Sequence, residues 1–111
     1  MIVRKVEEVK PLEVNEEAEG VKIKVLIGEE EGALNFIMRY FSISPKGSIS
    51  YHAHDWEHEI FVLHGRGVIR GENALYVVEP GSFVYIPPKE KHSFENPFEE
   101  PFEFLCLIPK G

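Results

Sequence analysis

The sequence has little cysteine, no long apolar run and no excess of positive charge, and each absence excludes a class of protein. The single cysteine, Cys106, cannot form an internal disulfide, which is typical of proteins from a reducing cytoplasm. No apolar run approaches the ~20 residues of a membrane-spanning helix, and the first residues contain no apolar segment of a secretory signal. The net charge is −7 and there is no basic stripe, so neither nucleic acid nor membrane is an expected partner. We therefore expect a cytoplasmic protein.

Glutamine and threonine are also absent, and of the 19 acidic residues only Asp55 is an aspartate. Enrichment in glutamate together with loss of labile amides is typical of proteins from hyperthermophiles. The chain has 111 residues, a length that predicts one domain spanning residues 1–111.

Valine, isoleucine, phenylalanine and tyrosine occur in short runs that glycine and proline interrupt roughly every 8–12 residues, which predicts an all-β sandwich or barrel. We expect strands over residues 22–27, 34–43, 48–54, 59–63, 67–70, 74–78, 82–86, 91–95 and 102–108. Turn residues lie between them at 44–47, 64–67, 71–73, 79–81 and 87–88. Residues 7–19 are rich in glutamate and are expected to form one helical turn or an extended arm.

The last expected strand alternates clearly between apolar and polar residues. Glu103 marks its outer face, so Phe102, Phe104 and Cys106 are predicted to point inward.

Four of the five histidines are gathered in two short segments, and their spacing indicates a metal site. His52 and His54 are two positions apart, which places both imidazoles on one face of a strand. Two neutral imidazoles aimed at one point form half of a transition-metal site. His58 and His92 are the other two candidates. His64 shares the strand face of His58 by alternation, but at ~3.3 Å per residue it lies roughly 20 Å away and cannot bind the same ion.

Two sequence segments resemble the two motifs of the cupin superfamily, over most of residues 45–108. The first motif, G-x5-H-x-H-x3/4-E-x6-G, is matched by Gly47, then His52 and His54, then His58 and Gly65, with one residue fewer after the first glycine. The second motif, G-x5-P-x-G-x2-H-x3-N, is matched by Gly81, Pro87, His92 and Asn96, with Lys89 in place of the second glycine. The order and distance of the two motifs make this resemblance strong.

The departure from the family pattern lies at His58, which occupies the position of a carboxylate ligand. Glu57 and Glu59 stand on either side, so Glu59 remains an alternative ligand. The segment from His54 to residue 63 closely resembles the small single-domain manganese cupins of hyperthermophilic bacteria, whose metal is held by four histidines. This resemblance implies an all-β, single-domain cupin β-barrel, a double-stranded β-helix of jelly-roll type. It also implies a homodimer that exchanges N-terminal strands from residues 1–27.

The resemblance implies metal ligands at His52, His54, His58 and His92. Imidazole ligands by themselves favour zinc, copper, iron or nickel, whereas the resemblance points to manganese. We expect Mn(II), with Fe(II) or Zn(II) as alternatives.

The residues expected to line a pocket beside the metal are Arg39, Phe41, Ile49, Ile60, Phe94, Phe104 and Cys106. Cys106 is either a small core residue or part of the cavity wall. Arg39 is either a solvated surface residue or a carboxylate anchor at the cavity mouth.

The favoured function is a metal-dependent oxidoreductase of dioxygenase type that acts on a small apolar or enol-like substrate. A non-catalytic module that binds a metal or a small ligand is the alternative. An isomerase or decarboxylase is less favoured, because the glutamate that serves such cupins as ligand or base is absent from its motif position.

Overall fold

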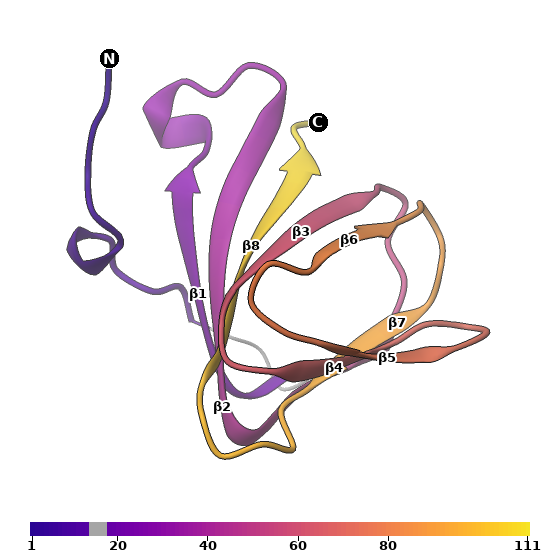
Figure 1. Cartoon of the computed structure of the whole chain (residues 1–111). Coiled ribbons are helices and arrows are strands. Elements are labelled where there is room, and N and C mark those ends of the chain that lie inside the picture. Colours follow the sequence, from indigo (N-terminus) through magenta and orange to yellow (C-terminus); the bar gives the residue numbers. More distant parts are fainter. Residues whose placement is uncertain (14–17) are drawn as a thin grey trace.

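The computed structural model describes residues 1–13 and 18–111, and nearly all regular structure in them is β (Figure 1). The strands are β1 (Ala18–Ile27), β2 (Phe36–His52), β3 (His58–His64), β4 (Gly67–Arg70), β5 (Leu75–Val78), β6 (Phe83–Ile86), β7 (His92–Glu95) and β8 (Phe102–Pro109). Two short 3-10 turns, η1 (Val6–Glu8) and η2 (Glu29–Glu31), flank β1. Residues 14–17 of the glutamate-rich segment lie outside the described residues. No helix within these ranges is long and apolar enough to cross a membrane.

The strands form one curled antiparallel sheet in the order β5-β4-β7-β2-β8-β3-β6, with β1 added beside β2. Figure 1 shows the long strands β1, β2 and β8 on one side, while the shorter strands β3 to β7 fold over to the other. The sheet thereby encloses an interior, and the expected jelly-roll type of all-β barrel is confirmed.

Strand β2 continues through residues 44–47, where the sequence predicted a turn between two strands. Its first part pairs with β8 from Phe36 to Ile43, and its second part pairs with β7 from Ser48 to His52. Lys46 has a positive φ of 69°, and its N–H donates to the carbonyl oxygen of Asn96 at 2.7 Å. The prediction of two strands was wrong because proline and glycine here bend one strand between two partners, and the chain does not reverse.

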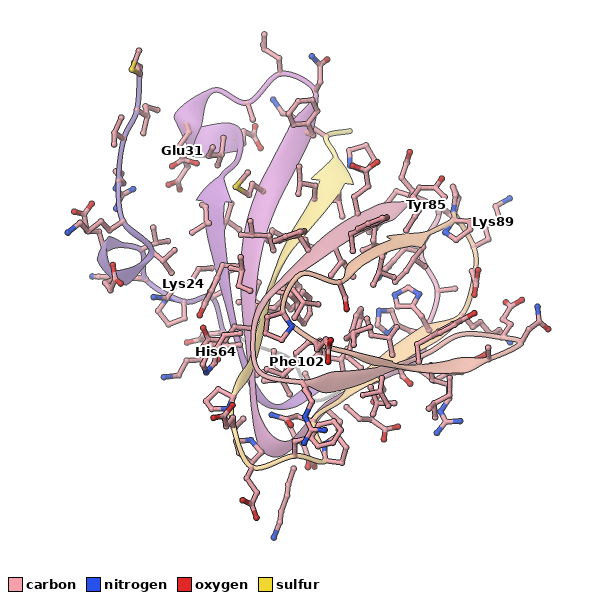
Figure 2. All side chains as sticks on the ribbon, in the orientation of Figure 1. Lys24, Glu31, His64, Tyr85, Lys89 and Phe102 are labelled. Atoms are coloured by element: carbon pink, nitrogen blue, oxygen red, sulfur yellow. The ribbon has the colours of Figure 1, made fainter. Side chains whose placement is uncertain are left out.

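The expected alternation of β8 is confirmed, because Phe102, Phe104 and Cys106 are exposed by only 0, 0 and 1%. Strand β3 also alternates from His58 to Val62, but its register shifts between Val62 and His64. Alternation predicted that His64 shares the face of His58. This was wrong, because His64 is exposed whereas His58 is buried. In Figure 2, His64 lies at the end of β3 remote from Tyr85, which pairs with the residue after His58.

Strand β1 pairs with β2 of its own chain, from Ala18 opposite Ile49 to Ile27 opposite Met38. This strand therefore has a partner within a single copy of the protein. The exchange of N-terminal strands between two copies stays a prediction.

Candidate metal centre

Strands from three parts of the chain bring four histidines together. His52 ends β2, His54 follows in the turn, His58 begins β3 and His92 begins β7. His52 and His92 are direct partners in the β2–β7 pairing, so the bend in β2 determines this contact. The ring centroids are 4.5 Å apart for His52 and His54, 4.7 Å for His52 and His92, 5.1 Å for His54 and His58, and 5.0 Å for His58 and His92.

The candidate ligand nitrogens of His52, His54 and His92 all lie within 4.8 Å of one another. Two nitrogens bound to one ion at ~2.2 Å can be separated by at most ~4.4 Å, so small side-chain shifts would bring all three to one ion. His52 and His92 use Nδ1 to contact the carbonyl oxygens of Ser50 and Glu90, in each case two residues earlier. Such contacts orient the ring and leave Nε2 free to bind a metal.

Two buried ring nitrogens without hydrogen-bond partners indicate whether a metal fits this cluster. His58 and His92 are 4 and 2% exposed. Their Nδ1 and Nε2 atoms, respectively, are buried and have no hydrogen-bond partner among the described residues. A buried polar atom without a partner is unfavourable. In His92, Nδ1 contacts the carbonyl oxygen of Glu90, and Nε2 is the nitrogen without a partner. The imidazole donor set is compatible with a divalent transition metal.

The environment keeps these rings in the neutral form that binds metals. Burial, followed by electrostatic interactions with His92 and Arg39, lowers the pKa of His58 from 6.5 to about 3. The pKa of His54 is also lowered, mainly by burial and then by His52. Burial lowers the pKa of His92, although its hydrogen bond to Glu90 opposes the change. A neutral imidazole can bind a cation at neutral pH without first releasing a proton.

His58 faces the other histidines, whereas the two neighbouring glutamates do not. His58 lines the same cavity as His52, His54 and His92. Glu57 and Glu59 instead line a separate outer pocket with Asn35 and Phe36. This placement favours His58 over Glu59, but His58 lies outside the closest group of three, so its role as a fourth ligand remains a proposal.

The histidines lie at a cavity of about 250 Å³ inside the curled sheet. Six of the seven residues expected to line the pocket do so: Arg39, Phe41, Ile49, Phe94, Phe104 and Cys106. Ile60 is not among the lining residues within the part of the chain that the structure describes. It packs into the hydrophobic core, where it is 2% exposed. Three aromatic rings form a stacked wall, with Phe104 5.0 Å from Phe41 and 5.3 Å from Phe94.

Three further lining residues were not found from the sequence: Glu13, Ala18 and Ile23. They belong to the N-terminal segment and β1, which lie beside the site only because β1 pairs with β2. No motif marks them. Glu13 matters most, because it is an acidic residue among the lining residues that the structure describes.

The structure also bears on the alternatives left open for Cys106 and Arg39. Cys106 belongs to the hydrophobic core and also lines the cavity, and burial raises the pKa of its thiol although Arg39 opposes this. Arg39 is half-buried and lines the cavity, so it is not a fully solvated surface residue.

Comparisons with known proteins agree with this fold. A family model described as "Cupin domain" matches residues 39–108. The chain is 34% identical over 71 residues to a 1-methylthio-D-xylulose 5-phosphate methylsulfurylase of Rhodospirillum rubrum, a match covering 64% of this chain and 46% of the relative. It is 33% identical over 93 residues to a glucose-6-phosphate isomerase of Pyrococcus abyssi, covering 73 and 49%. The chain therefore spans about half the length of these curated relatives.

Among solved structures, the polyketide cyclase RemF from Streptomyces resistomycificus superimposes with a TM-score of 0.92 at 33% identity. This match covers 98% of the present chain and 79% of the other.

Proposed function

This chain belongs to the cupin family, and from that premise we propose that it is a metal-dependent enzyme acting on a small apolar or enol-like substrate. The observation that carries the proposal is the cluster of neutral imidazoles that lines a cavity of the curled sheet, with unpartnered nitrogens on His58 and His92. In this proposal His52, His54, His58 and His92 hold one divalent ion. Mn(II) is the expected native metal, with Fe(II) or Zn(II) as alternatives.

The protein contributes positioning and exclusion of water to this chemistry. When bound, a divalent ion held by neutral ligands would supply a strong Lewis acid and, as manganese or iron, a redox centre. The stacked rings of Phe41, Phe94 and Phe104 form an apolar wall that shields a substrate from bulk water. The contacts of His52 and His92 with backbone oxygens hold their rings in place.

The reaction type that we favour is oxidation of an enol-like substrate, as in a dioxygenase. Its support is the largely apolar and aromatic wall around the histidines, since redox chemistry needs no acid–base residue. The lining also includes one residue that the sequence did not indicate, the acidic Glu13.

A second candidate is non-redox chemistry at a carbonyl group, such as isomerisation or cyclisation. Glu13 favours it, because a carboxylate in the cavity offers a group that can accept a proton. The names of the isomerase and cyclase relatives point in the same direction.

Metal content tests the site itself. We expect about one metal ion per chain in the wild-type protein, and a marked loss when any of the four histidines is replaced by alanine. The matched pair is His58→Ala and Glu59→Ala, measured by elemental analysis after purification from metal-supplemented medium. Full occupancy in His58→Ala with loss in Glu59→Ala would assign the ligand to Glu59.

Oxygen dependence separates the functions. The manganese- or iron-loaded protein is incubated with enediols, flavonoid-like compounds and aryl alkenes while oxygen is recorded. Oxygen uptake that requires His54 supports the oxidoreductase, whereas conversion of a hydroxyketone under nitrogen supports the second candidate. Binding of small dicarboxylates without any turnover would favour the non-catalytic binding module.

A further inference from the structure

Arg39 is the one charged residue of the cavity wall contributed by the central strand β2, and its donors are incompletely used. Its Nη2 donates to Cys106 Sγ at 3.2 Å. Its Nε is buried and has no hydrogen-bond partner in the part of the chain that the structure describes. Arg39 also forms none of the ion pairs found between the described residues. A buried guanidinium N–H without an acceptor is unfavourable, so an acceptor from outside the chain would stabilise this arrangement.

The guanidinium contacts two residues of the cavity wall, Cys106 and Phe41. Its Cζ lies 4.9 Å from the centre of the Phe41 ring, which stacks on Phe104. Strand pairing places Arg39 opposite Cys106 on β8, so the sulfur contact and the ring contact come from two adjacent strands. A planar guanidinium fixed in this way is prepared to bind a planar, bidentate anion.

We propose that Arg39 is a specificity-determining residue that binds a carboxylate group of the substrate, whose other end faces the histidine cluster. This inference rests on the proposed function, because it names the substrate class of the same site. The cavity volume of about 250 Å³ restricts the ligand to a small carboxylic acid, since drug-sized ligands occupy ~300–1,000 Å³. A carboxylate fits better than a phosphate dianion, because the lining residues within 1–13 and 18–111 include one fixed cation, Arg39, and also the acidic Glu13.

The single tryptophan of the chain provides a readout that is independent of activity. The Trp56 ring stacks on His54 with centroids 4.6 Å apart, so its fluorescence is expected to respond to binding in the cavity. The probes are pyruvate and its neutral analogue pyruvamide, added to protein loaded with redox-inert Zn(II), with calorimetry as an independent measure of affinity.

The expected result is a preference for pyruvate over pyruvamide of about tenfold or more, the contribution of one hydrogen-bonded charge. Arg39→Met should abolish this preference, Arg39→Lys should keep part of it, and the matched control Arg70→Met should leave it unchanged. Arg70 is suitable because it pairs with Glu95 outside this cavity. Melting curves establish that the variants are folded.

An unchanged preference in folded Arg39→Met would overturn the assignment. Methyl phosphate that binds more tightly than pyruvate and depends on Arg39 would also overturn the choice of a carboxylate. The two proposals fail separately, because metal content is measured in the same samples. Normal metal content without a pyruvate preference contradicts only the role of Arg39. A protein that holds no metal but prefers pyruvate through Arg39 contradicts only the metal-dependent function.

Discussion

His58 shows how a single residue connects metal binding to stability. It is 4% exposed and faces three other histidines, so burial and neighbouring positive charge both oppose its protonation. The metal-free protein must therefore keep this ring neutral. The neutral ring is also the form that binds a metal, so burial and metal binding favour the same protonation state.

We predict that the metal-free protein loses stability as the pH falls below about 6.5. In the unfolded chain His58 takes up a proton near its ordinary pKa of 6.5, whereas the folded pKa is about 3. The unfolded state therefore binds more protons between these values, and the free energy of unfolding decreases as the pH falls through this window. Urea unfolding of chelator-treated protein at a series of pH values measures the slope.

The slope should be reduced in His58→Gln and retained in His64→Gln, because His64 is an exposed histidine outside the cavity. Equal slopes in His58→Gln and the wild type would contradict the effect of burial.

The connections between strands depend on glycines with two different roles. Gly65, between β3 and β4, and Gly81, between β5 and β6, both have positive φ angles, of 70 and 92°. A β-carbon added at Gly65 would lie 2.0 Å from the carbonyl oxygen of Pro101, whereas one added at Gly81 would meet no atom within 4 Å. The turn at Gly65 is therefore in close contact with the chain that enters β8.

This contrast predicts different costs for the same substitution. Gly81→Ala should lower the free energy of unfolding by about 1–2 kcal/mol, the cost of a left-handed conformation. Gly65→Ala adds a steric overlap with the backbone, worth a further ~1–3 kcal/mol or more. Denaturant melts of the two variants measure the difference, and equal losses would show that the contact with Pro101 relaxes without cost.

At the scale of the whole molecule, an exposed apolar face extends across strands β3 and β6. Phe61, Leu63, Phe83 and Tyr85 are exposed by 45, 42, 84 and 57%, and Phe61 pairs directly with Phe83 across β3 and β6. Strand β6 ends the sheet order, so one of its edges has no partner among the strands that the structure describes. Exposed apolar faces and open edges of this kind favour association.

We expect a homodimer at micromolar concentration, as the resemblance to the small manganese cupins implies. Light scattering measures the mass in solution, and a monomer would contradict the prediction. If this face is buried in the dimer, Phe61→Lys combined with Phe83→Lys should shift the protein toward monomer, because buried lysines would be unpaired. Leu34→Lys is the control, since Leu34 is 84% exposed on another part of the surface.

The sequence by itself determined the features that depend on local periodicity and motif spacing. A strand places alternate residues on one face, so Phe102, Phe104 and Cys106 could be assigned to the interior without knowledge of the fold. The same argument paired His52 with His54; the two rings do meet, although the expected strand over 48–54 ends at His52 and His54 lies beyond it. Motif order then led to the cupin family, and with it to His58 and His92 as neighbours of that pair.

Only the tertiary structure decided which distant residues meet. The bend that keeps β2 continuous, the register shift that exposes His64, and the entry of Glu13 into the cavity all arise from pairings between segments far apart in the chain. The unpartnered Nε of Arg39 is likewise visible only once Cys106 and Phe41 surround it. Local residue preferences carry no information on such contacts, because each is determined by the packing of the whole sheet.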